Sequence, residues 1–145
     1  MTPNASKLSS LMLVQKIQQN KIDTISHVLV AAKGCAADLH QKIAQMGSDL
    51  TAEMAHLTLE SAPYIANYIG AVRKSQAFLR EELLQQEAEI TEMEEHLLQH
   101  IQRKKFVGVP VKRIIEEIAR EELKLEVSEL DEFAQSQFIR SKWSN

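Results

Sequence analysis

Two interlocking seven-residue apolar series constrain the fold of this 145-residue chain more than any other feature. Apolar residues that alternate at three and four positions and repeat every seven form the a/d seam of a coiled coil, because they line one side of a helix. In the first half of the chain the two series are Ile22, Leu29, Ala36, Ile43, Leu50 and Leu57, and Ile25, Ala32, Leu39 and Met46. In the second half they are Ile69, Leu83, Ile90, Leu97, Val111 and Ile118, and Val72, Leu79, Met93, Val107 and Ile114, with Gln76, Gln86, His100 and Lys104 as polar members.

The two halves complement each other in one constant antiparallel register, if the chain folds back near Ser61 and Pro63. A random arrangement of apolar residues would not keep one register over so many layers. The sequence therefore predicts an all-α fold, a long two-helix antiparallel coiled-coil hairpin with a longer second helix. The pairs are Leu57 with Ile65, Leu50 with Val72, Ile43 with Leu79, Leu39 with Leu83, Leu29 with Met93, Ile25 with Leu97 and Leu11 with Val111.

The expected hairpin forms a single domain over residues 1–145. Helix one is expected over about 6–57, the turn over 58–62 and helix two over about 62–138. Ser61 is a suitable N-cap for helix two, and Pro63 lies in the first turn, where a missing N–H does no harm. Residues 1–6 are polar, so we expect the N-terminus to be frayed.

The segment Gly108-Val109-Pro110 could be a linker between domains or a kink in helix two. Proline inside a helix removes a hydrogen bond and clashes with the preceding turn, at a cost of about 3 kcal/mol. However, Val107 and Val111 keep the same seven-residue phase as the residues before the segment. A linker would give no reason for that phase to survive, so a helix kinked at Pro110 is favoured.

The register leaves the chain after about Ile118 without a partner on helix one. This overhang carries a new apolar stripe at helical spacing, and an amphipathic helix without a partner must bury its apolar face against another copy or a different protein. The stripe consists of Ile115, Ala119, Leu123, Val127, Leu130, Ala134 and Phe138.

Composition and charge argue against several classes of partner. The net charge is −3 and the pI is about 6.0, so neither nucleic acid nor an anionic membrane is an expected partner. Cys35 is the only cysteine, which excludes an intramolecular disulfide and suits a reducing cytosol. No apolar run reaches the length of a membrane span.

The sequence carries no constellation typical of an enzyme, and no cofactor or metal is expected. His96 and His100 with Glu92 could chelate a metal, but a polar seam position that sets the register explains His100 better. The acidic run between Glu81 and Glu95 is typical of a solvated helix face. A basic band could contact an acidic protein surface; its members are Arg103, Lys104, Lys105, Lys112 and Arg113.

Three short segments of the chain carry a family resemblance. The sequence Ser128-Glu129-Leu130-Asp131-Glu132-Phe133-Ala134-Gln135, the sequence Arg103-Lys104-Lys105-Phe106 and the neighbourhood of Lys33-Gly34-Cys35 resemble segments of FliJ. FliJ is the small cytoplasmic component of the bacterial flagellar type III export apparatus. With length and hairpin plan included, the resemblance covers nearly the whole chain, although the Gly108/Pro110 segment is atypical of the family.

The resemblance implies a central stalk that inserts its terminal end into a hexameric export ATPase. It also implies contacts with the cytoplasmic domain of the export gate and with substrate chaperones, so the protein would reach the inner membrane only through other proteins. At the gate, Tyr68 is the expected contact; Val72 matches the same region, but it belongs to the predicted seam. The residues expected at the ATPase end are Lys112, Arg113, Leu123, Val127, Leu130 and Phe133.

Two alternatives stay open from the sequence. One is the equivalent stalk of a virulence injectisome. The Asp131-Glu132-Phe133-Ala134 motif favours the flagellar system over this alternative. The other is a dimeric coiled-coil export chaperone or scaffold that buries the overhang against its own copy.

Overall fold

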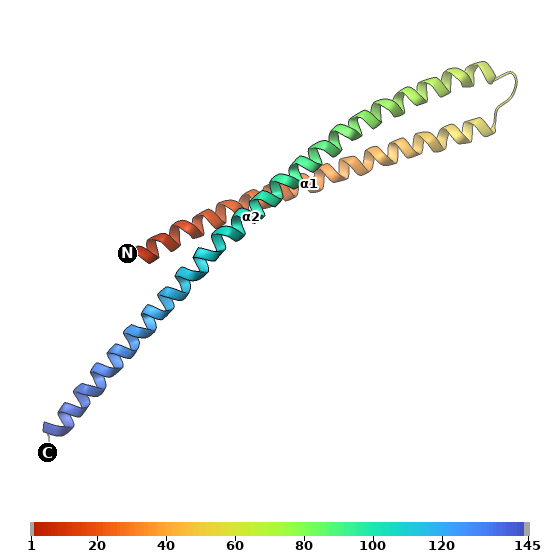
Figure 1. The fold of residues 1–145 in the computed structure, drawn as a ribbon. Coiled ribbons are helices and arrows are strands. Elements are labelled where there is room, and N and C mark those ends of the chain that lie inside the picture. Colours follow the sequence, from red (N-terminus) through yellow and green to blue (C-terminus); the bar gives the residue numbers. More distant parts are fainter. Residues whose placement is uncertain (1, 144–145) are drawn as a thin grey trace. The chain divides into compact units, whose positions relative to one another are not determined.

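The chain consists of two long helices, α1 (Pro3–Ala55) and α2 (Ala62–Trp143), in a computed structural model that describes residues 2–143 (Figure 1). The helices pack against each other, and no strand occurs among the described residues. The all-α two-helix hairpin is therefore confirmed. The chain divides into two compact units, one of residues 21–99 and one of residues 1–20 with 100–145. The single domain over 1–145 stays a prediction.

Helix α1 begins at Pro3, earlier than the sequence predicts. The Ala5 N–H donates to the Thr2 hydroxyl at 3.2 Å, and the Ser6 N–H donates to the Thr2 carbonyl at 3.1 Å. Thr2 is therefore the N-cap, and Pro3 occupies the first helical position, where its fixed φ suits the helix and its missing N–H costs nothing. The expected fraying is wrong for residues 2–6, because this cap satisfies the first turn, and Met1 lies outside the described residues.

Helix α1 ends at Ala55, two residues before the expected boundary. The last turn tightens, since the N–H groups of His56 and Leu57 donate to carbonyls three residues earlier at 3.2 and 3.3 Å. Leu57 lies outside the helix and is 54% exposed. The expected layer of Leu57 with Ile65 is therefore wrong, and the seam of this unit ends with Leu50.

The turn between the helices is closed by the side chains of Thr58 and Ser61. Their hydroxyls lie 2.8 Å apart, and each hydroxyl also accepts from the other residue's backbone N–H, at 3.1 and 3.3 Å. The Ile65 N–H donates to the Ser61 carbonyl at 3.0 Å, which places Ser61 at the start of α2 as expected. However, the Ser61 hydroxyl bonds back to Thr58 and so braces the turn. Pro63 lies in the first turn of α2.

The unit of residues 21–99 buries the predicted seam. Leu29, Ala32, Ala36, Leu83 and the polar member Gln76 are buried. The other seam positions of this unit within the helices are half-buried, and most of the remaining helix surface is exposed. This alternation of exposure at three and four residues is the signature of an a/d seam between two helices. The seam predicted from the sequence is therefore confirmed in this unit.

The unit of residues 1–20 with 100–145 continues the same phase through Pro110. Val111 and Ile114 are buried, and α2 is helical across the Gly108-Val109-Pro110 segment. A Cβ atom at Gly108 would lie 3.4 Å from Gln15 Nε2, the end of a flexible side chain, so this position does not require glycine. The linker alternative is excluded, because the helix does not end there.

Polar side chains in the seam find partners on the opposite helix. In the unit of residues 21–99, Gln76 donates to the Ile43 carbonyl at 3.3 Å and Gln86 donates to the Ala32 carbonyl at 3.4 Å. In the other unit, His100 Nδ1 lies 2.7 Å from Gln18 Oε1. Lys104 Nζ donates to Gln19 Oε1 there. Buried polar groups are costly when unpaired, so these contacts penalise a slipped register.

Candidate docking surface

The overhang of α2 is exposed along its whole described length. From Ala119 to Trp143, each residue of α2 is exposed, and the preceding seam position, Ile118, is half-buried. The predicted loss of pairing after about Ile118 is therefore confirmed. In the stripe, Leu123 is 59% exposed, Val127 50% and Leu130 66%. A row of large apolar side chains with this exposure marks an interaction surface.

The seam ends where its phase becomes polar. After Ile118, the seven-residue positions are occupied by Glu121, Leu125, Ser128 and Glu132, which would place carboxylates and a hydroxyl against α1. Asn4, near the start of α1, donates to the Glu121 carboxylate at 3.4 Å, and this polar contact is found where the seam ends. The sequence itself therefore stops the pairing at this point.

The stripe lies on a different side of α2 from the seam. At about 100° per residue, the stripe from Ala119 to Phe138 is rotated by roughly 160° from the side that Val111 and Ile114 present to α1. An extension of α1 along the seam would leave the stripe uncovered. The stripe therefore suits a partner that approaches from the side of α2 away from α1.

Other apolar residues of the overhang widen this surface beyond the predicted stripe. Phe133, expected at the ATPase end, is exposed, and so are Leu125, Ile139 and Trp143. The last three do not follow the spacing of the stripe, so the sequence pattern did not select them. The sequence marks these three residues only as large apolar side chains in a segment that has no partner helix.

One residue of the basic band lies in the seam, and others lie on the exposed surface. Lys104 is half-buried at a seam position and bonds to Gln19, so the seam accounts for it. Lys112 and Arg113 are exposed between the buried residues Val111 and Ile114. They belong to the same unit as the overhang, and their charges remain accessible for an acidic partner.

Tyr68 and Val72, expected near the export gate, differ in exposure. Tyr68 is 40% exposed, whereas Val72 is half-buried at a seam position. Val72 therefore packs between the helices, and Tyr68 is the residue of the two that a partner can reach. Both residues lie in the unit of residues 21–99.

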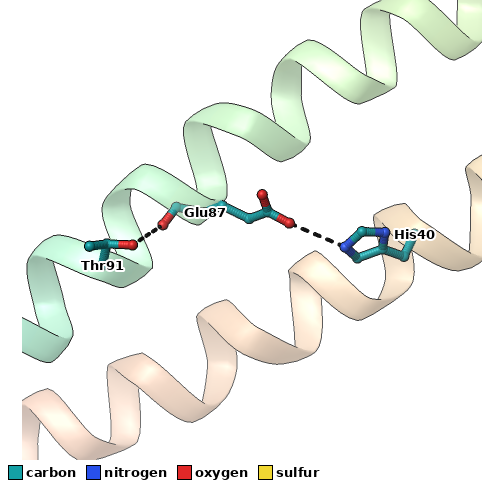
Figure 2. A network of polar contacts seen from close by, with 3 residues as sticks. All are labelled: His40, Glu87 and Thr91. Atoms are coloured by element: carbon teal, nitrogen blue, oxygen red, sulfur yellow. Dashed lines mark hydrogen bonds and ion pairs between the residues drawn. The ribbon is translucent and has the colours of Figure 1, made fainter.

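The acidic segment of α2 makes exposed ion pairs with α1. His40 Nε2 lies 3.2 Å from the Glu87 carboxylate, while the Thr91 hydroxyl donates to the Glu87 carbonyl at 3.0 Å (Figure 2). Lys33 pairs with Glu94 at 3.3 Å. The side chains of these two pairs are half exposed or more, so each pair contributes roughly 0–1 kcal/mol. Their arrangement is that of a solvated coiled-coil flank.

The proposed metal ligands do not converge within the described residues. His96 Nε2 lies 3.7 Å from Glu92 on the same face of α2, while His100 contacts Gln18 in the seam. No group of three histidine, cysteine or carboxylate side chains among residues 2–143 could hold a metal ion. His100 therefore acts as a seam residue, as the sequence favours.

Comparison with known proteins gives no assignment: no family model, curated protein or solved structure matches the chain. Within the described residues, neither helix contains a stretch apolar enough to cross a membrane.

Proposed function

We propose that this protein is a non-enzymatic component of the bacterial flagellar type III export apparatus, the central stalk of the export ATPase ring. The observation that carries the proposal is the overhang of α2, which presents an apolar stripe without a partner on α1. A coiled-coil hairpin that ends in one exposed amphipathic helix fits insertion into a ring, because the stripe gains its buried surface only in the complex. The resemblance of the Asp131-Glu132-Phe133-Ala134 segment to FliJ supports the same location.

The proposal assigns separate tasks to separate surfaces. The apolar stripe with Phe133 enters the ring, and Lys112 and Arg113 contact acidic residues at its rim. Tyr68, in the other unit, contacts the export gate, and substrate chaperones bind elsewhere on the hairpin. In this scheme the protein is cytoplasmic and associates with the inner-membrane apparatus through protein contacts alone.

The injectisome stalk has the same architecture and is the alternative within this class. The two systems differ in their ATPase, so the identity of the ATPase that co-purifies with the chain distinguishes them. The flagellar version predicts loss of motility in a deletion strain. Loss of effector secretion with normal motility would support the injectisome version.

The central test replaces Leu123, Val127 and Leu130 with serine and measures stimulation of the purified export ATPase. The matched control replaces three equally exposed apolar residues of the other unit, Phe78, Leu84 and Leu98, with serine. We expect the stripe variant to lose stimulation and the control variant to keep it. Equal stimulation by both variants would refute the stripe as the surface that enters the ring.

A further inference from the structure

The apolar stripe changes its repeat from seven residues to eleven. Its members from Ala119 to Phe138 are spaced four, four, three, four and four residues apart. Eleven residues span three turns of an almost straight helix, so such a stripe stays on one side without the left-handed supercoil of a heptad seam. The overhang therefore presents a straight apolar row that a second straight helix can follow.

The row is also self-complementary in side-chain size. If a second copy of the row lies antiparallel, with the two-fold axis between Ser128 and Glu129, one register sets each small residue against a large one. Two copies fill each other's gaps in this register, as an isologous interface requires. The pairs are Ala119 with Phe138, Leu123 with Ala134, and Val127 with Leu130, each formed twice.

A parallel arrangement of the two rows does not fill the same space. In parallel, Ala119 faces Ala119 and Ala134 faces Ala134, which leaves gaps between the large residues on either side. On the single chain, a shallow hollow at one end of the row is lined by Ala134, Gln135, Phe138 and Ile139. The antiparallel register places the second copy's Leu123 over this hollow.

The charges beside the row agree with the same antiparallel register. Lys124 and Asp131 are exposed on one flank, and the two-fold axis brings Lys124 of each copy near Asp131 of the other. Glu116, in line with the row and before Ala119, lies near the second copy's Lys142. Glu122 and Glu126, on the opposite flank, lie opposite Gln137 and Phe133 of the second copy.

From these observations we propose that a second copy of this chain binds the stripe, through an antiparallel pairing of the two overhangs. The contact consists of six layers between two single helices, a small interface, so we expect the dimer to be reversible at micromolar concentrations. The ATPase ring and the second copy would compete for one surface. The pairing itself does not depend on the proposed function, because it needs only the chain.

Sedimentation equilibrium of the full chain, over about 1–300 µM and without ATPase, tests the dimer. Leu123→Ala opens a gap and Ala134→Leu sets two leucines against each other, so each weakens the dimer about tenfold. The double variant exchanges large for small across the two-fold axis and restores affinity to within about threefold of the wild type. Both substitutions lie on an exposed surface and introduce strong helix formers, so all three variants keep the fold.

The outcomes are decisive in each direction. A monomer throughout this range overturns the proposal, and so does a dimer that both single variants leave unchanged. If the double variant is weaker than either single variant, the antiparallel register is wrong. In a Cys35→Ser background, a Leu123→Cys chain mixed with an Ala134→Cys chain should form the mixed disulfide faster than either chain forms its own. Faster homodimeric disulfides would indicate parallel pairing and overturn the register.

Discussion

Replacing Leu83 with alanine should destabilise the protein far more than replacing Leu123 with alanine. Both are leucines on α2, but Leu83 is 8% exposed in the seam, whereas Leu123 is 59% exposed on the stripe. Removing a buried leucine side chain costs about 2–5 kcal/mol, through lost transfer free energy and the cavity left behind. No large side chain among the described residues is fully buried, so neighbours and water can partly fill the cavity. We therefore expect about 2–3 kcal/mol for Leu83→Ala.

For Leu123→Ala the expected change in the free energy of unfolding is below about 0.5 kcal/mol, because the leucine has no apolar partner within the hairpin register. Urea unfolding followed by circular dichroism at low micromolar concentration measures both variants. With an m value of about 2 kcal/mol/M, Leu83→Ala lowers the midpoint by about 1–1.5 M, and Leu123→Ala leaves it nearly unchanged. Equal losses of stability would mean that the stripe packs inside the hairpin, which would refute the reasoning.

Four further predictions follow from the same contacts. Cysteines at Leu29 and Met93, in a Cys35→Ser background, should form a disulfide within one chain under mild oxidation, because the antiparallel register makes them neighbours; only intermolecular disulfides on a non-reducing gel would contradict it. Gln76→Leu should raise the melting temperature but reduce register specificity, because it removes a polar group that donates to the Ile43 carbonyl; a lower melting temperature would show that the hydrogen bond outweighs apolar packing. Lys112→Glu with Arg113→Glu should weaken ATPase binding most at low salt, and equal loss at all salt concentrations, measured by titration, would argue against a rim contact. Tyr68→Ala should reduce pull-down of the export gate domain without altering melting, and Phe78→Ala is the exposed aromatic control on the same helix.

The seven-residue series predicted the seam because burial between two helices depends on a repeat that the sequence displays directly. Ile25, Leu39 and Leu79 are half-buried, and Leu29 and Leu83 are buried, as the register requires. The phase also favoured a helix, kinked at Pro110, over a linker, and α2 is helical across this segment. The seven-residue repeat was therefore a better guide to the helices than local helix-breaking residues such as Gly108 and Pro110.

Local hydrogen bonds at the helix ends were harder to predict. Because Thr2 caps α1, the helix begins at Pro3 and not at about residue 6. The Thr58 and Ser61 hydroxyls close the turn after Ala55, and Leu57 is exposed there. These details depend on which of several nearby hydroxyls bonds to which backbone group, and the apolar repeat carries no information on that choice.

The exposed overhang could be located from the sequence, but the full set of its exposed apolar residues could not. The register required an unpaired segment after Ile118, and the structure exposes it. Leu125, Ile139 and Trp143 lie outside the predicted stripe, because no repeat marks them. The partner that covers the surface is a separate question, since exposure alone does not determine chemistry.

The most direct test of the central claim is photocrosslinking from position 130 in cells that contain the export ATPase. A photoreactive amino acid replaces Leu130 on the stripe, and the matched control carries it in place of Leu84, which is equally exposed in the other unit. The proposed docking surface predicts covalent capture of the ATPase subunit from position 130 and none from position 84. Capture of the ATPase from position 84 alone, or crosslinks from position 130 only to α1 of the same chain, would contradict it.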